Sequence, residues 1–199
     1  METLVLPCAD AEALAQVFAT LARVLSDTPT AQTAGTVAQL ASALGVACPH
    51  DVPLAALERD HADLFVVPNP RYVAPYESVY RDLSALPPGV EAGTSARSGL
   101  LMGPSTLEVR RSQLEAGLEP QRDLPDHVAN EFWFMAHLWH KEAAAADDER
   151  AEWASRRERF ADAHLREWLG ELTACVERNQ QCGVYGAALE IALAVLELE

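Results

Sequence analysis

The sequence predicts an all-α fold, a single-domain helical bundle over residues 1–199 with a Pro/Gly-rich hinge. Apolar residues recur every three or four positions through most of the chain, which is the spacing of amphipathic helices. Ala and Leu are abundant whereas Gly is sparse, and this composition favours helices. No stretch alternates apolar and polar residues over a useful length, so we expect no sheet.

The N-terminal third is expected to form three helices. The first runs over about 10–25, with Asp10 as its cap, and the second over about 31–44, with Gly45 as its stop. Asp51 and Pro53 open the third helix, which covers about 51–65. The apolar stripe of the first helix is Leu14, Val17, Phe18, Leu21, Val24 and Leu25. The third helix places Leu54, Leu57, His61, Leu64 and Phe65 on one side.

Proline-rich segments interrupt the middle of the chain. Prolines forbid a regular helix over 66–80, yet this segment is apolar and aromatic, so we expect it to fold against the body, with Tyr76 and Tyr80 on one face of a short helix. Residues 86–103 form a Pro/Gly/Ser-rich link, a candidate hinge for a domain-swapped dimer. The next helix starts at Pro104 and carries Leu107, Arg111, Leu114 and Leu118.

The stretch 119–138 organises the rest of the chain. Its second half predicts a buried helix with Val128, Phe132 and Met135 on one face. Its first half predicts the helix start: Pro125 suits the first turn, and Asp123 or Leu124 would be the cap. Asp126 would then place negative charge at the positive helix end. Two further helices are expected over about 147–169 and 185–196.

Composition narrows the possible partners. The net charge is −15, with 30 acidic against 15 basic side chains, which argues against nucleic acid and permits a basic partner. Solubility alone would also explain this charge. The four cysteines, Cys8, Cys48, Cys175 and Cys182, form no Cys-x-x-Cys pair, which fits a reducing compartment. The start has no signal-peptide pattern and no segment is long enough to span a membrane, so we expect a cytoplasmic protein.

Motifs for common catalytic chemistry are missing from the sequence. It has no phosphate-binding loop, no dinucleotide fingerprint and no nucleophile elbow. Glu58 and His61 have the spacing of helical di-iron bundles, but no second copy exists. His137 and His140 could form a ligand pair but have no third ligand. We therefore expect no catalytic residue, no metal and no resident cofactor.

Three stretches carry a resemblance to a known family. Leu64-Phe65 precedes Ala-Pro-Tyr-Glu-Ser-Val-Tyr at 74–80. Glu119-Pro120 precedes Pro-Asp-His-Val-Ala-Asn-Glu-Phe-Trp-Phe-Met at 125–135, and Phe-x-x-x-His-Leu-x-x-Trp follows at 160–168. Together, in this order and at these separations, they resemble the TorD/DmsD/NarJ family of chaperones for molybdenum and tungsten oxidoreductases, and the TorD/DmsD branch more than the NarJ branch. Val66-Val67-Pro68 and Phe132 depart from the family pattern without affecting its functional residues.

The resemblance implies an all-helical, non-enzymatic, cytoplasmic chaperone. Such proteins bind the twin-arginine signal peptide and the apo form of a molybdopterin-containing oxidoreductase catalytic subunit. They assist cofactor insertion and hold back export until the partner is mature. The residues carried over by the resemblance are Pro125, Asp126, His127, Glu119, Glu131, Tyr76, Glu77, Ser78 and Tyr80.

Side-chain chemistry is compatible with this function. Carboxylates such as Asp126, Glu119 and Glu77 can pair with guanidinium groups in a bidentate way. Pro75, Tyr76, Tyr80 and Phe132 could line an apolar groove for the rest of the peptide.

Structural explanations of the same residues stay open. Tyr76 and Tyr80 could equally be core residues, and we expect Phe132 to be one. Asp126 and His127 could serve only as a helix-start charge and a partner of Glu131. The alternative functions are a guanine-nucleotide or pterin-cofactor-binding maturation factor, or a ligand-free acidic helical interaction module. The oligomeric state could be a monomer or a domain-swapped homodimer.

Overall fold

The computed structural model describes residues 10–82, 101–118 and 124–198. All regular structure in these residues is helical, apart from an isolated antiparallel bridge between Tyr76 and His127. The predicted all-α class is therefore confirmed. Cys8, Glu119 and most of the predicted hinge lie outside the described residues, so the hinge and the domain swap stay predictions.

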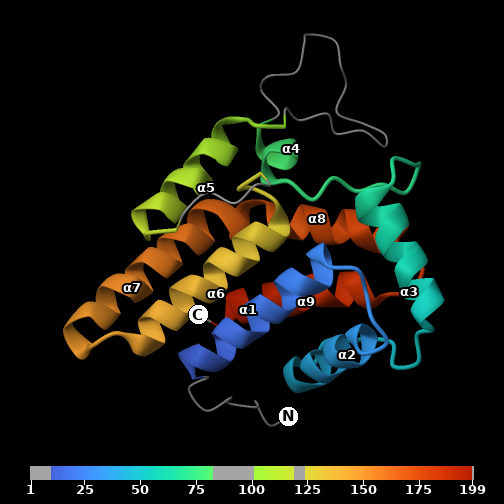
Figure 1. Cartoon of the computed structure of the whole chain (residues 1–199), viewed down its shortest axis with the longest axis horizontal. Helices are drawn as coiled ribbons and strands as arrows, with labels where there is room; N and C mark the ends of the chain where they lie inside the picture. Colours follow the sequence, from blue (N-terminus) through green and yellow to red (C-terminus); the bar gives the residue numbers. More distant parts are fainter. Residues whose placement is uncertain (1–9, 83–100, 119–123, 199) are drawn as a thin grey trace.

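The described chain forms a layered bundle of helices (Figure 1). They are α1 (Ala11–Ser26), α2 (Thr33–Leu44), α3 (Leu54–His61), α4 (Glu77–Arg81), α5 (Pro104–Glu115), α6 (Val128–Ala144), α7 (Asp147–Phe160), α8 (Arg166–Asn179) and α9 (Val184–Glu197). Two π-helical segments, η1 (Ala62–Val66) and η3 (Ala161–Leu165), follow α3 and α7.

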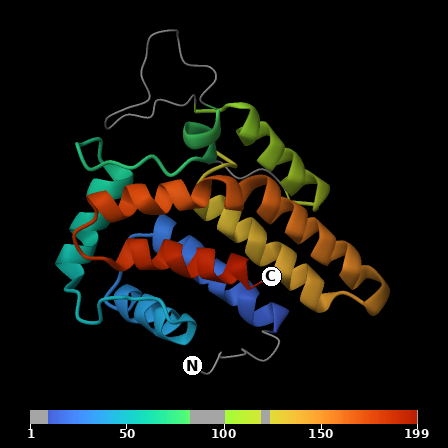
Figure 2. The same ribbon diagram turned by 180° about the vertical axis from the view of Figure 1, so that it is seen from behind.

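The core of the bundle forms around α1 and α6. These two helices pack along their lengths, and the rings of Phe18 and Phe132 meet edge to face with centroids 5.6 Å apart. Helix α9 packs on α1, α2 and α8 and is buried along most of its length, as its almost wholly apolar sequence requires (Figure 2). Phe132 is fully buried, so the expectation that it is a core residue is confirmed.

Local signals place the ends of several helices within two residues of the prediction. The side chain of Asp10 accepts a hydrogen bond from the backbone N–H of Glu12 and so caps α1. Gly45 ends α2 with a φ of 71°, a left-handed conformation that glycine adopts at low cost. The predicted helix over 147–169 instead continues to Asn179. It changes direction at η3 (Figures 1 and 2).

The proline-rich loop before α4 folds against the body, as predicted. Buried Asp60 on α3 pairs with Arg71 of this loop and accepts hydrogen bonds from the backbone N–H groups of Gln181 (2.9 Å) and Cys182 (3.0 Å). Arg71 Nε also donates to the backbone oxygen of Asn179 at 2.7 Å. The loop is thus fixed to the turn between α8 and α9.

The start of α6 differs from the prediction. Asp123 or Leu124 was expected as the cap with Pro125 in the first turn, but α6 begins at Val128. His127 is the N-cap, and its Nδ1 accepts a hydrogen bond from the backbone N–H of Ala129 at 3.1 Å. Pro125 lies in the preceding turn, because the backbone there pairs with the segment before α4.

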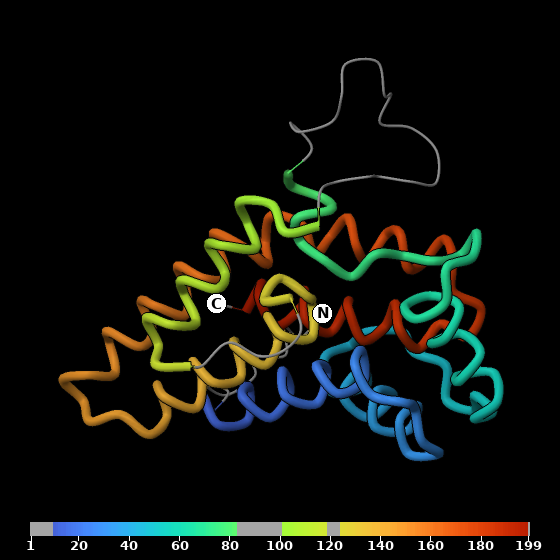
Figure 3. Tube along the Cα trace, turned by 45° about the horizontal axis from the view of Figure 1, so that its top comes forward, coloured from blue at the N-terminus to red at the C-terminus, as the bar shows by residue number. Residues whose placement is uncertain are grey.

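The buried face of α5 is not the one that carries its leucines. Leu107 and Leu114 are 64% and 51% exposed. The buried residues of α5 are Ser105, Thr106, Val109 and Gln113. Asp82, just after α4, accepts a hydrogen bond from the backbone N–H of Ser105, which fixes the start of α5 beside α4. Helix α5 then runs beside α7 (Figure 3).

This orientation of α5 predicts that truncating Leu114 has little effect on the free energy of unfolding. We expect Leu114→Ala to change the free energy of unfolding by no more than about 0.5 kcal/mol, since the side chain is half exposed. Leu138→Ala is the matched control: Leu138 is 1% exposed, and its truncation should cost roughly 2–5 kcal/mol. Urea titrations of both variants measure the difference. Equal losses would contradict the orientation of α5.

Candidate functional site

The candidate site is built on two loops that pair with each other. The backbone N–H of Glu77 donates to the oxygen of Asp126, and that of Val128 donates to the oxygen of Pro75, both at 2.9 Å. Between these hydrogen bonds, Tyr76 and His127 form the antiparallel bridge. We call this arrangement the loop clasp. It brings the two strongest sequence signatures together at the starts of α4 and α6.

Asp126 is the polar centre of the loop clasp and is fully buried. Its Oδ2 accepts a hydrogen bond from the backbone N–H of Ser78 at 3.1 Å. That N–H group lies in the first turn of α4, where backbone donors have no partner inside the helix. The carboxylate of Asp126 therefore caps α4 from a distant part of the chain.

Two glutamates lie buried beneath the loop clasp. The carboxylate of Glu77 pairs with Arg81, and its two oxygens lie 2.9 and 3.1 Å from Nδ1 of His164. Glu131 accepts a hydrogen bond from Nε1 of Trp168 at 3.1 Å. Burial first, and then the charge of Glu77, raise the pKa of Glu131 well above its usual range. Glu131 thus holds a proton more tightly than an ordinary glutamate.

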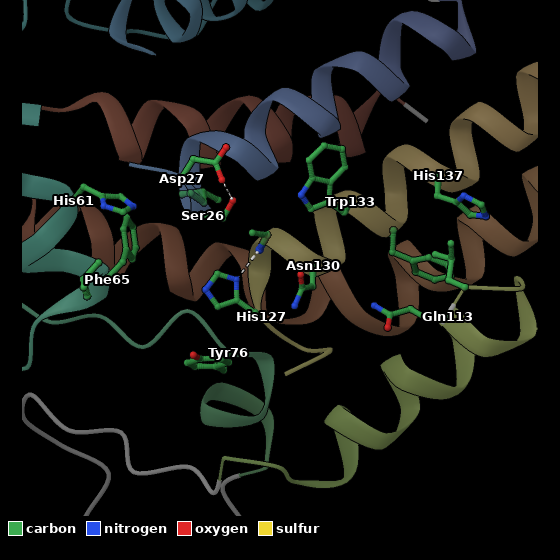
Figure 4. A pocket seen from close by; sticks show the side chains of 15 residues that line it. Ser26, Asp27, His61, Phe65, Tyr76, Gln113, His127, Asn130, Trp133 and His137 are labelled. Carbon is green, nitrogen blue, oxygen red and sulfur yellow. Dashed lines mark hydrogen bonds between the residues drawn. The ribbon is translucent and has the colours of Figure 1, made fainter. Parts of the chain in front are cut away.

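A cavity of about 870 Å³ opens on the other side of the loop clasp (Figure 4). Tyr76 and His127 form part of its wall, with their rings edge to face and centroids 5.2 Å apart. Its polar lining consists of Ser26, Asp27, His61, Tyr76, Gln113, His127, Asn130 and His137. Its apolar lining consists of Leu25, Phe65, Val66, Leu118, Ala129, Trp133 and Phe134. The cavity therefore offers hydrogen-bond acceptors beside an aromatic surface.

Two histidines of this wall each have a ring nitrogen without a hydrogen-bond partner among the described residues. Burial lowers the pKa of His61 and of His137. Nε2 of each ring is buried and has no hydrogen-bond partner among the described residues. Each ring therefore holds an unused polar atom beside the cavity.

The structure divides the predicted site residues into two groups. Tyr76 and His127 line the cavity. The buried group below the loop clasp consists of Pro75, Glu77, Ser78, Asp126 and Glu131. Tyr80 is in the core, 5.3 Å from Trp168 between ring centroids, while Pro125 lies in the turn before α6. Glu119 lies outside the described residues. Contact between any of these residues and a peptide stays a prediction.

Sequence reasoning missed several residues of the cavity wall. Asp27 was not among the predicted site residues, and His61 was considered only for its place beside the core and its di-iron spacing from Glu58. Trp133 is 40% exposed at the cavity and stacks against Arg23. An aromatic residue of α6 outside the stripe of Val128, Phe132 and Met135 was the available signal for Trp133, whereas nothing local pointed to Asp27.

Two other kinds of site are absent from the described ranges. No three His, Cys, Asp or Glu side chains of these ranges gather closely enough to hold a metal ion. No helix in the described part of the chain has the length and apolar character needed to cross a membrane.

Comparisons with known proteins found one matching family and a similar solved structure. Residues 9–174 match the family model of the nitrate reductase delta subunit. The crystal structure of a proposed redox enzyme maturation protein from Archaeoglobus fulgidus is similar over 100% of both chains, with a TM-score of 0.54 and 18% sequence identity. At that identity the likeness concerns the fold. No curated protein matches the sequence.

The raised pKa of Glu131 predicts how the free energy of unfolding depends on pH. The folded state binds this proton more tightly than the unfolded state, so its contribution to stability is complete below the ordinary value near 4.5 and is lost as the pH rises toward the raised value. Glu131→Gln imitates the protonated form and keeps an acceptor for Trp168. We expect this variant to be at least as stable as the wild type at about pH 8, with a flatter dependence of unfolding free energy on pH.

Glu77→Gln is the matched control for this experiment. It removes the charge that faces Arg81 and His164, so it should cost roughly 3–5 kcal/mol under the same conditions. Denaturant titrations across the pH range measure both variants. A Glu131→Gln protein that is as destabilised as Glu77→Gln would show that Glu131 is charged in the folded state.

Proposed function

We propose a function on the basis of family: the chain belongs to the nitrate reductase delta subunit family, whose model matches residues 9–174. The resemblance to the TorD/DmsD/NarJ chaperones noted in the sequence is thereby confirmed as a family assignment. The TorD/DmsD branch stays a prediction. On this basis the chain is a redox enzyme maturation chaperone and not a catalyst.

The proposed ligand is the twin-arginine signal peptide of a molybdopterin-containing oxidoreductase catalytic subunit. The chaperone would bind the apo form of this partner in the cytoplasm, assist cofactor insertion and delay export. The observation that carries this proposal is the loop clasp, because it puts Tyr76 and His127 of the two signatures on the wall of one cavity. The volume of about 870 Å³ is in the range of ligand sites in proteins.

The chemistry of the cavity suits such a peptide. A twin-arginine signal has a basic head and a short apolar core. The aromatic wall formed by Phe65, Trp133 and Phe134 suits the apolar core, and the polar groups of Asp27 and His61 suit the basic head. The net charge of −15 would draw a basic peptide toward the protein over long range.

The buried residues of the signatures are assigned a supporting role. Asp126 and Ser78 hold the start of α4, and Glu77 ties it to α8 and its preceding π segment through His164. Through α4 and the loop clasp they fix the positions of Tyr76 and His127 at the cavity. Their replacement would then disturb binding by moving the wall, without direct contact with the peptide.

The alternative functions receive less support. A guanine nucleotide or a pterin cofactor carries phosphate, and no Lys or Arg of the described residues lines this cavity. A ligand-free interaction module would need no such cavity beside the loop clasp.

A signal-peptide titration tests the proposal. The wild type should bind a synthetic twin-arginine signal peptide, measured by calorimetry, and should bind a scrambled peptide of the same composition much more weakly. His127→Asn should weaken binding by about tenfold, since it removes the imidazole from the cavity wall while Asn still caps α6.

His50→Asn is the matched control, because His50 is exposed and does not line the cavity. It should leave the affinity unchanged. The absence of wild-type binding would overturn the proposed function. Equal affinities for the wild type and His127→Asn would show that the peptide binds somewhere other than this cavity.

A further inference from the structure

One end of the cavity is electronegative. Asp27 is the only carboxylate that lines the cavity within the described residues. It is the C-cap of α1, where the last carbonyl groups of the helix add partial negative charge. Figure 4 shows Asp27, Ser26 and His61 near one end of the cavity, away from Gln113 and His137.

Asp27 has no cationic partner among the described residues. Its side chain accepts a hydrogen bond from Oγ of Ser26 at 2.9 Å, and no described Lys, Arg or His forms an ion pair with it. Arg23, one turn earlier on α1, lies over the ring of Trp133 at 5.3 Å. The carboxylate is exposed at the cavity and available to a charged ligand.

His61 supplies a second acceptor at the same end. Its side chain is 7% exposed, and its buried Nε2 has no hydrogen-bond partner among the described residues. Burial lowers the pKa of His61, and the charge of Asp27 acts in the opposite direction, which reflects the proximity of the two groups. A neutral ring with a buried, unused acceptor is stabilised by a ligand that donates to it.

We propose that Asp27 and His61 form a guanidinium subsite that takes one arginine side chain of the bound peptide. The inference rests on the proposed function, because it requires a basic peptide in this cavity. A guanidinium group presents five N–H donors in a planar fork, so it can reach a carboxylate and an imidazole nitrogen together. The ammonium group of lysine is a compact charge without this fork, so lysine should be the weaker ligand.

The subsite also gives the peptide a direction. In Figure 4, Trp133 lies between Asp27 and His137, on the side of Asp27 that faces the end of the cavity with Gln113 and His137. With an arginine at Asp27, the apolar part that follows it in a signal peptide would lie against Trp133 and its apolar neighbours. The acidic end thus selects the basic head, and the aromatic surface takes the apolar core.

A double-mutant cycle tests the subsite. The probes are a twin-arginine signal peptide and two versions in which either arginine is replaced by glutamine, each titrated into the wild type and Asp27→Asn. We expect Asp27→Asn to weaken binding of the twin-arginine peptide by about tenfold. It should have almost no effect on the peptide that lacks the contacted arginine, because the interaction is already lost.

Asp51→Asn is the matched control. Asp51 is exposed and outside the cavity, so its replacement removes the same charge from the protein without touching the subsite. It should change the affinity by less than about twofold, at the level of a screened surface charge. Asp27→Asn keeps the size of the side chain, and circular dichroism before each titration verifies that α1 is intact.

The outcomes separate the two proposals. If the wild type fails to bind the twin-arginine peptide, the proposed function is overturned, and the subsite with it. If the wild type binds and Asp27→Asn binds equally well, only the subsite is overturned. If Asp27→Asn weakens all three peptides by the same factor, Asp27 acts through long-range charge alone, and the subsite is again wrong.

Discussion

The loop clasp is the constraint on which the rest of the site depends. Helices α4 and α6 each begin with backbone N–H groups that no helical carbonyl can satisfy. The segment before each helix supplies part of what the other lacks, because Pro75 accepts from Val128, and Asp126 accepts from Glu77 and Ser78. Helix α4 spans only residues 77–81, too short to be stable alone. Its position, and hence that of Tyr76, follows from the buried carboxylate of Asp126.

The polar layer below the loop clasp lowers the stability of the fold unless its charges are compensated. Glu77, Asp126 and Glu131 are all fully buried, and three negative charges so close together in a protein interior would repel strongly. Arg81 and His164 face Glu77, while burial and the charge of Glu77 raise the pKa of Glu131 well above its usual range. A well-packed apolar core would be at least as stable, so the retention of these groups is consistent with a requirement for a defined geometry at the helix starts.

The sequence predicted the features that depend on neighbours along the chain. The stripes and caps of α1, α2 and α9 are local, and they were predicted to within two residues. The start of α6 was misplaced because Pro125 is compatible with a first helical turn, and only pairing with the distant Pro75 segment holds it outside. The inner face of α5 was not evident because polar Ser105 and Gln113 are buried there while Leu107 is exposed.

In the site, too, the features that depend on sequence neighbours were predicted and those that depend on distant packing were not. Motif resemblance identified the two segments that form the loop clasp, yet it could not tell residues that form the wall from residues that support it. Asp126 was expected to pair with a peptide because it is a carboxylate in the signature, but its side chain is turned inward to Ser78. The carboxylate that faces the cavity is Asp27, which belongs to no motif and reaches the site only through the packing of α1 on α6.

Charge acts on two length scales in this protein. The net charge of −15 attracts any basic peptide, but this attraction is spread over the surface and falls off within about 10 Å in physiological salt. It can speed encounter and cannot distinguish arginine from lysine. Discrimination needs polar groups fixed at short range, and among the described residues the cavity offers one carboxylate, Asp27, with the imidazole of His61 at the same end. A wall with many carboxylates would bind cations indiscriminately. A single carboxylate beside a neutral acceptor instead matches the shape of one guanidinium group.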